Sequence, residues 1–413
     1  MTQPLIRSAA AGVTAAILLA AAPLVLGQGT GSAPKWITAW GTSQQGVGDT
    51  AITNATVRMI ARVTIPGQRI RIRLDNAYNT APVTIGRAAV GYRVQGAAVA
   101  AGSSRAVTFS GSASVSIPPN GSVWSDPIAL PVLAQQDLAV SFFIPGADVK
   151  PSQHNGAVVT SYRTADGSGD LVTMEPRTSF TGTTTAMWWL KAIDVESDTS
   201  ANAVVAFGDS ITDGTCSTLD AHDRWEDVVA MRLALQPDGR KIAIVNEGIG
   251  GNTITREGLM PPAVSTPGIE RLDRDVLGHH GVSHVVFFMG TNDINRAQTA
   301  ARVIEGLSSL IARTKAGGLK AIGVTIVPRH QVAPPDAPLP GWTPQKTAIR
   351  NEVNQWIRTK APFDAVIDFD KVVQSPTDPN LLNPAFNCGD NIHPSPAGYF
   401  AMGNAVDLKL LVR

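Results

Sequence analysis

The sequence has few charged residues and almost no net charge. Asp, Glu, Lys and Arg account for 16% of its 413 residues, and the formal charge at neutral pH is +1. A surface that binds nucleic acid needs an excess of Lys and Arg, so the composition predicts no nucleic-acid partner. Apolar residues make up 44%, which is typical of a globular protein, and the length suits two domains behind a short leader.

Long apolar runs are absent after residue 26. The one long run covers residues 9–26, follows Arg7 and ends near Gly27-Gln28. A positive start, an apolar middle and a small-residue end are typical of a secretory signal peptide. We therefore predict a signal peptide over residues 1–27 and an exported protein, secreted, periplasmic or at the cell surface, with no stable membrane partner after cleavage. The alternative is an uncleaved anchor, because the run is nearly long enough to span a bilayer.

Cysteine is scarce, with only Cys216 and Cys388 in the chain. The first follows Ser210 by six residues and the second precedes Asp390 by two. Export permits disulfides, and a bridge here would join these two segments. It would close a loop of about 170 residues, worth about 5 kcal/mol in the chain-entropy model. We predict this disulfide; two unrelated free thiols are the alternative.

No long amphipathic helix pattern interrupts residues 34–197. The run Arg69-Ile70-Arg71-Ile72-Arg73-Leu74 alternates with a period of two, as in a strand with one wet and one buried face. Turn-forming pairs such as Pro66-Gly67 separate the apolar segments. We predict an antiparallel β-sandwich of the jelly-roll kind for this region. Further strands are expected at 57–65, 83–94, 124–130 and 138–144.

The pattern changes after the polar stretch 194–202. Over residues 203–413 apolar strands alternate with amphipathic stretches, which predicts βαβ units and a parallel sheet covered by helices on both faces. Ligands bind beyond the carboxyl ends of the strands in such sheets. Strands are expected at 204–207, 242–245, 284–289, 321–327 and 365–369, and helices at 224–235, 269–277, 299–316, 343–359 and 396–411.

Polar motifs follow the first three of these strands. Gly208-Asp209-Ser210 ends the first, residues 246–252 follow the second, and Gly290-Thr291-Asn292-Asp293 follows the third. These loops converge on one edge of the predicted sheet. A fourth motif, Asp390-Asn391-Ile392-His393, lies just before the helix start Ser395-Pro396. A serine becomes a nucleophile when an imidazole accepts its proton and a carboxylate orients that imidazole, so Ser210, His393 and Asp390 are a predicted triad.

Taken singly, each motif has a simpler interpretation. Asp390 and His393 could belong to a helix-capping loop, and Asn292 could simply end its strand. For Asp209 and Asp293 we favour this supporting role in their loops. The glycines at 248–251 could form a turn, since the motif lacks the Gly-Lys-Ser/Thr ending of a phosphate loop.

Two other site classes are disfavoured. Thr212 stands where the Gly-x-Ser-x-Gly elbow of α/β-hydrolases has its second glycine. His279, His280 and His284 could suggest a metal site, but the first two are adjacent at the end of a predicted helix, which favours a solvated helix terminus. We predict no metal and no cofactor.

The order and spacing of the four motifs over residues 203–413 resemble those of the SGNH hydrolases, the GDSL-type esterase and lipase superfamily. The resemblance implies a flavodoxin-like doubly wound parallel sheet and a serine ester hydrolase. It matches Ser210 to the nucleophile, Asp390 and His393 to the rest of the catalytic triad, and Gly251 and Asn292 to the oxyanion-hole donors beside the Ser210 amide. Isoleucine replaces the leucine of the name-giving motif, an exchange between apolar residues.

The resemblance extends to exported two-domain carbohydrate esterases of the acetylxylan type, in which a jelly-roll-like domain precedes the hydrolase domain. It implies hydrolysis of acetyl or other short acyl esters, on small molecules or polysaccharide, through an acyl-enzyme intermediate. A lipase or lysophospholipase-type esterase is one alternative, and a non-catalytic polysaccharide-binding protein is another. The sandwich either binds sugar or only buttresses the active-site edge. Trp36, Trp40, Trp188 and Trp189 are candidate stacking residues whose positions suit packing between domains better.

Overall fold

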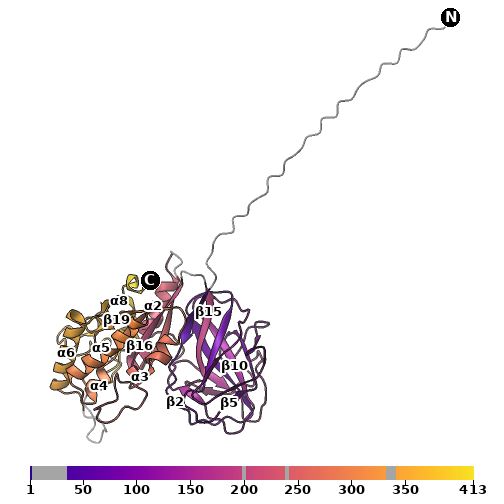
Figure 1. The fold of residues 1–413 in the computed structure, drawn as a ribbon, viewed down its shortest axis with the longest axis horizontal. Helices are drawn as coiled ribbons and strands as arrows, with labels where there is room; N and C mark the ends of the chain where they lie inside the picture. Colours follow the sequence, from indigo (N-terminus) through magenta and orange to yellow (C-terminus); the bar gives the residue numbers. More distant parts are fainter. Residues whose placement is uncertain (2–34, 198–200, 238–240, 332–340) are drawn as a thin grey trace. The chain divides into compact units, whose positions relative to one another are not determined.

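The structure, a computed structural model, describes Met1 and residues 35–197, 201–237, 241–331 and 341–413. Residues 34–413 form one compact unit, drawn in Figure 1. The predicted signal peptide, residues 1–27, lies outside the described residues except for Met1, so it stays a prediction. Within the described ranges no helix is both long and apolar enough to cross a membrane.

The chain from Lys35 to Ser197, the β-rich part, consists of antiparallel sheets. The four-stranded sheet has the order β1 (Lys35–Gly41), β15 (Leu190–Ser197), β4 (Ile70–Asp75) and β9 (Ser122–Trp124). The six-stranded sheet has the order β13 (Gly182–Thr184), β12 (Ser161–Arg163), β3 (Ala55–Val63), β10 (Gln136–Ile144), β6 (Arg87–Tyr92) and β7 (Arg105–Val107). Smaller sheets join β14 (Met187–Trp188), β11 (Ser152–His154) and β2 (Gly46–Val47), and β5 (Val83–Ile85) with β8 (Val115–Ile117).

Strand β4 shows why the sequence pattern predicts this architecture. Ile70, Ile72 and Leu74 are fully buried, whereas the arginines between them are partly exposed. The antiparallel β architecture predicted for this region is confirmed. Two predicted strands differ: 83–94 divides at Gly86 into β5 and β6, and the strand predicted over 124–130 is wrong, since β9 shares only Trp124 with it.

The C-terminal region contains a five-stranded parallel sheet. Its order is β17 (Ile242–Gly248), β16 (Asn202–Gly208), β18 (Val282–Phe288), β19 (Lys320–Val324) and β20 (Ala365–Ile367). If the strands are numbered 1 to 5 along the chain, their order across the sheet is 2-1-3-4-5, which is the flavodoxin-like doubly wound arrangement. The predicted fold class is therefore confirmed.

Helices cover both faces of this sheet, as Figure 1 shows for the C-terminal region. On β16, Val205 and Phe207 pack in one hydrophobic cluster, and Val204 and Ala206 pack in another. The first cluster receives side chains from α3 (Gly268–Leu272), its continuation as the π-helix η1 (Asp273–Leu277), α4 (Thr291–Asn295), α5 (Ala300–Ala316) and α6 (Pro344–Thr359). The second receives side chains from α1 (Ser210–Asp213), α2 (Trp225–Ala234), α7 (Phe369–Val373), α8 (Pro396–Ala405) and the 3₁₀ helix η2 (Leu408–Leu411).

The β-rich part and the parallel sheet share one hydrophobic core. Ile37 and Val195 belong to the same buried cluster as Val205 and Val245. Hydrogen bonds also cross between the regions, for example from the Ile244 amide to the Thr64 hydroxyl at 3.1 Å. The change from antiparallel to parallel pairing falls between β15 and β16, but the division into domains at 34–197 and 203–413 stays a prediction.

Candidate active site

Ser210 begins a helix directly after a buried strand. β16 ends at Gly208, and the side chain of Asp209 then caps α1 by accepting a hydrogen bond from the Ile211 amide at 3.0 Å. A Cβ on Gly208 would collide with the Thr212 side chain, so the tight turn needs glycine there. Ser210 is 8% exposed and is the first residue of the helix.

Three side chains form a continuous hydrogen-bonded chain. Ser210 Oγ lies 2.8 Å from Nε2 of His393, and Nδ1 of His393 lies 2.6 Å from Oδ2 of Asp390. The other Asp390 oxygen accepts the Ile392 and His393 amides at 2.8 and 2.9 Å. The structure thus brings together the predicted triad from the two ends of the C-terminal region.

The Asp390 carboxylate is set up to orient the imidazole. Burial alone would raise its pKa, but hydrogen bonds from the His393 side chain and backbone outweigh burial and lower the pKa to about 2. An ionised Asp390 accepts the Nδ1 proton of His393, which leaves Nε2 with its lone pair toward Ser210. This is the protonation state in which an imidazole can act as a general base.

Gly251 lies on the loop that follows β17, which we call the Gly251 loop, whereas Asn292 is the second residue of α4, just after β18. Gly251 has φ of 70°, in the left-handed region that favours glycine, and no hydrogen bond joins its amide to another described residue. The Asn292 side-chain amide donates one hydrogen to the Asn252 carbonyl at 3.0 Å, which leaves its second hydrogen free to donate elsewhere. This bond ties the Gly251 loop to α4. Among the described residues no hydrogen bond joins Gly251 or Asn292 to Ser210, and their role as oxyanion donors stays a prediction.

Asp209 and Asp293 support these loops, as predicted. The Asp293 carboxyl group accepts the Ile254 amide at 3.0 Å and the Thr255 amide at 3.3 Å, which fixes the segment after the Gly251 loop. Burial raises the pKa of Asp293 to about 7 and that of Asp209 to about 6. Neither carboxyl group belongs to the triad.

Arg271 on α3 is a supporting residue that sequence analysis missed. Its buried guanidinium donates to the Gly208 carbonyl at 2.9 Å, the Glu247 carbonyl at 2.8 Å and Oδ1 of Asn252 at 3.1 Å. It therefore links the end of β16, just before the serine, to both sides of the Gly251 loop. An arginine on a predicted amphipathic helix gives no local signal of such a role.

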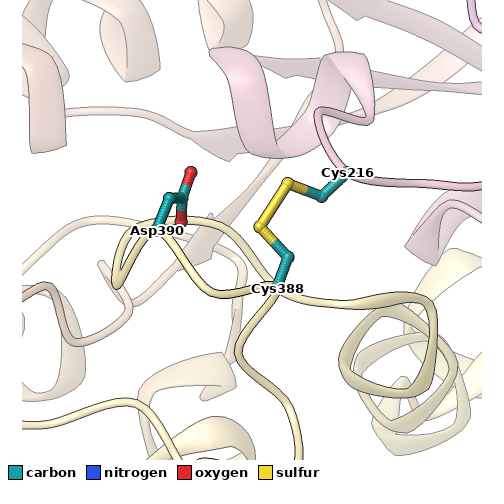
Figure 2. Close-up of side chains that lie close together, drawn as sticks. All are labelled: Cys216, Cys388 and Asp390. Carbon is teal, nitrogen blue, oxygen red and sulfur yellow. A yellow bond between two sulfur atoms is a disulfide. The ribbon is translucent and has the colours of Figure 1, made fainter.

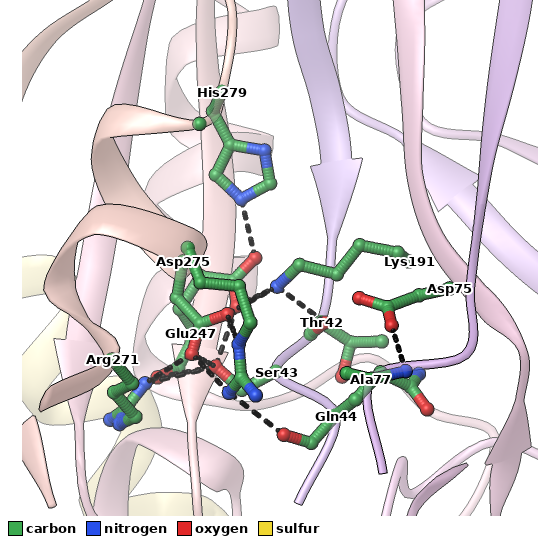
Figure 3. Close-up of polar contacts among 12 residues, drawn as sticks. Thr42, Ser43, Gln44, Asp75, Ala77, Lys191, Glu247, Arg271, Asp275 and His279 are labelled. Carbon is green, nitrogen blue, oxygen red and sulfur yellow. Dashed lines mark hydrogen bonds and ion pairs between the residues drawn. The ribbon is translucent and has the colours of Figure 1, made fainter. Parts of the chain in front are cut away.

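Around Arg271 lies a buried group of charges that we call the charge cluster, formed by Lys191, Glu247, Arg271 and Asp275 (Figure 3). The half-buried Arg274 donates to Asp275 at 2.8 Å. Lys191 of the β-rich part donates to Oε2 of Glu247 at 2.8 Å and to Oδ1 of Asp275 at 2.7 Å. Burial opposes ionisation of both acids, but the neighbouring cations outweigh burial and hold their pKa values below the usual range. The cluster thus joins the β-rich part to the strand end that precedes Gly251.

The three histidines near residue 280 do not gather into a metal site, and the predicted solvated helix terminus is wrong for His279 but holds for His280, whose side chain is 41% exposed. His279 is buried, with Nε2 2.6 Å from Oε1 of Glu247, as Figure 3 shows. His280 lies against the Trp124 ring, with centroids 5.1 Å apart. His284 is buried within β18. The β-rich part covers this helix end, which no local pattern could reveal.

Cys216 and Cys388 form a disulfide, so the predicted pairing is confirmed (Figure 2). The bond ties the segment after α1 to the loop that carries Asp390 and His393. Both sulfurs and an Asp390 oxygen lie close together, as in a metal site, but the sulfurs are bonded to each other and offer no thiolate.

Comparison with known proteins gives one family match. Residues 206–401 match the model of the GDSL-like lipase/acylhydrolase family. Among curated proteins, no relative matches the chain.

Several solved structures resemble about half of the chain. Est24, a carbohydrate acetylesterase from Sinorhizobium meliloti, is 20% identical over 51% of this chain and 98% of its own, with a TM-score of 0.39. A putative lipolytic protein of the G-D-S-L family from Desulfitobacterium hafniense is 20% identical over 49% of this chain and 97% of its own, with a TM-score of 0.38. The aryl esterase of M. smegmatis is 19% identical over 49% of this chain and 95% of its own, with a TM-score of 0.38.

Proposed function

Over residues 206–401 the chain belongs to the GDSL-like lipase/acylhydrolase family and is a serine ester hydrolase, and from this premise we propose that it is an exported esterase of short acyl esters with Ser210 as nucleophile. The observation that carries the assignment of Ser210 is its hydrogen bond of 2.8 Å to His393, whose other nitrogen contacts Asp390. No metal or cofactor takes part in the proposed reaction.

The proposed reaction proceeds in two steps. Ser210 Oγ attacks the ester carbonyl while His393 accepts the serine proton, and His393 then gives that proton to the departing alcohol. This leaves an acyl group on Ser210. In the second step His393 takes a proton from water, the resulting hydroxide attacks the acyl group, and His393 returns the proton to the serine as the carboxylic acid leaves.

Negative charge forms on the carbonyl oxygen in both steps. We assign its stabilisation to the Ser210 and Gly251 amides and the free hydrogen of the Asn292 side-chain amide. Support comes from the open Gly251 amide and from the bond that orients Asn292 on Asn252. Donors that are oriented before substrate binds need no reorganisation as the charge develops.

For the substrate we propose acetyl or other short acyl esters, with acetylated polysaccharide as the natural class. This rests on the predicted signal peptide and on the resemblance to exported carbohydrate esterases. The disulfide supports export, because such bonds persist in oxidising compartments. The β-rich part is not proposed to bind sugar through its tryptophans, since Trp188 and Trp189 are buried and Trp36 faces the guanidinium of Arg71 at 4.6 Å.

An ester-release assay tests the proposal. Wild type, Ser210→Ala and the neighbouring control Ser217→Ala would be compared on p-nitrophenyl esters of short and long acids, on lysophosphatidylcholine and on acetylated xylan. We expect wild type and Ser217→Ala to release acetate and short acids, and Ser210→Ala to release none. Equal rates for wild type and Ser210→Ala would reject the nucleophile, and release only from long-chain or lysolipid substrates would replace the short-acyl proposal with a lipase-type one.

A further inference from the structure

His154, a residue of the β-rich part, contacts α1, the helix that begins at Ser210. His154 ends β11 and is 2% exposed. Its Nε2 lies 2.9 Å from Oδ1 of Asp213, the last residue of α1, and its Nδ1 lies 2.8 Å from the Ser43 carbonyl. No sequence motif marks His154 or Asp213 as part of a site.

Asp213 also binds the Gly251 loop and so connects His154 to that loop. Its second oxygen, Oδ2, accepts the Gly250 amide at 2.7 Å. The loop packs closely against α1 at this point, because a Cβ on Gly248 would collide with the backbone of Asp213. The amide of Gly251 belongs to the next peptide group, so the direction of that N–H depends on how Gly250 is held.

The partners of His154 define its charge. A carbonyl oxygen only accepts hydrogen bonds, so Nδ1 carries a proton toward Ser43. Nε2 faces a carboxylate oxygen of Asp213, and both ring nitrogens can donate only when the ring is protonated. Burial lowers the pKa of His154, but the charge and hydrogen bond of Asp213 outweigh burial and raise it. A charge-assisted pair of this kind is stronger and better oriented than a neutral hydrogen bond.

Ser43 connects His154 to the charge cluster. Its hydroxyl lies 2.6 Å from Oε2 of Glu247 and accepts from Arg271 at 2.9 Å. The same serine therefore fixes His154 through its carbonyl and Arg271 through its hydroxyl. Ser43 and His154 both belong to the β-rich part, which thus contacts the supports of the Gly251 loop on two sides.

From this geometry we propose that His154 is a positioning residue of the esterase reaction: through Asp213 it holds the Gly250–Gly251 peptide so that the Gly251 amide points at the oxygen that becomes negative. The inference rests on the proposed function. It makes the β-rich part a component of the catalytic unit, with no requirement that this part bind substrate. His154 touches neither substrate nor the triad.

Two conservative variants separate the two hydrogen bonds of His154. In His154→Gln the side-chain amide can take the place of Nε2 and donate to Oδ1 of Asp213, whereas in His154→Asn it takes the place of Nδ1 and leaves that oxygen without its donor. We expect His154→Asn to lower kcat on p-nitrophenyl acetate by about 10- to 100-fold, with KM within about twofold, because a misplaced oxyanion donor acts on the transition state. His154→Gln should retain kcat within about fivefold of wild type.

Asp213→Ala and its combination with His154→Asn complete the test. If His154 acts through Asp213, the double variant should be no slower than Asp213→Ala alone, because the alanine has already removed both hydrogen bonds of the carboxylate. Independent, multiplying losses would overturn the proposal, as would equal kcat for His154→Gln and His154→Asn. If His154→Asn does not fold, the comparison of wild type, His154→Gln and Asp213→Ala decides in the same way: Asp213→Ala must fall well below His154→Gln.

Wild type and Ser210→Ala run beside these variants separate this inference from the proposed function. Turnover by wild type above Ser210→Ala, together with unchanged kcat in His154→Asn, would reject the positioning role and leave the esterase intact. Equal turnover by wild type and Ser210→Ala would reject both.

Discussion

Asn292 is held in position by its neighbour before any substrate arrives. Its side-chain amide already donates one hydrogen to the Asn252 carbonyl, which orients the second hydrogen. Truncation of the side chain therefore removes an oriented donor and little packing. We predict that Asn292→Ala lowers kcat by about 100-fold or more. Steady-state kinetics on p-nitrophenyl acetate and a thermal melt would be measured together. A variant that melts like wild type and turns over at the same rate would remove Asn292 from the oxyanion hole.

A second residue-scale prediction concerns the buried acid Asp293, whose pKa is about 7 in the folded protein. In the unfolded chain an aspartate titrates near pH 3.9, so the folded state binds more protons between about pH 4 and pH 7. Its contribution to stability is therefore full below about pH 4 and is lost as the pH rises through about 7. Asn resembles the neutral acid and has no such loss.

The free energy of unfolding of wild type minus that of Asp293→Asn should thus fall by up to a few kcal/mol between pH 4 and pH 8. Urea unfolding of both proteins at the two pH values measures this difference, and the contributions of other titrating groups cancel. A difference that stays constant with pH would show that Asp293 is ionised throughout.

At the scale of elements, the Gly251 loop depends on its close packing against α1. A Cβ on Gly248 would meet the backbone nitrogen and Cα of Asp213, whereas a Cβ on Gly250 would meet only the Asp213 side chain, at 3.5 Å. We predict that Gly248→Ala lowers stability by about 1–3 kcal/mol and also lowers kcat, because the loop must move away from the helix. Gly250→Ala is the matched control and should stay close to wild type in both measurements. Equal behaviour of the two variants would contradict this packing.

Local patterns predicted the elements that depend on local physics. Thr343-Pro344 and Ser395-Pro396 are sequence signals for helix starts, and the structure has α6 and α8 begin there with Thr343 and Ser395 as caps. The alternation in β4 and the apolar runs of the parallel strands were equally informative. Pro127 shows a limit: it lacks the N–H that a ladder needs, and of the strand predicted over 124–130 only Trp124 belongs to a strand, β9.

The parts of the site that could not be predicted depend on contacts between distant segments. His279 is buried because β-rich residues cover the end of its helix. Arg271 can be buried because Ser43 and two strand ends accept hydrogen bonds from its guanidinium. The triad could be predicted from the sequence because its residue types and their spacing form recognisable motifs. No such motif contains Arg271, Asp213 or His154.

At the scale of the whole molecule, the disulfide spans a sequence separation of 172 residues. We predict that replacing both cysteines by serine lowers the free energy of unfolding by about 2–5 kcal/mol, because the unfolded chain loses its constraint. Urea unfolding with and without reductant would show the same difference in wild type and none in the variant. Thiol titration of denatured, unreduced protein should find no free thiol, and two free thiols would contradict the bond.

The pairing of β1 has a consequence for how the protein reaches its fold. β1 is the first described strand, lies at the edge of its sheet and pairs with β15, so that Thr38 meets Asp194 at a separation of 156 residues. A nascent chain must therefore carry β1 unpaired through synthesis of almost the whole β-rich part. Such long-range pairing is slow, and an unsatisfied strand edge attracts other chains meanwhile. We therefore expect the yield of native protein to depend on how long β1 stays unpaired, a kinetic quantity separate from the stability of the folded molecule.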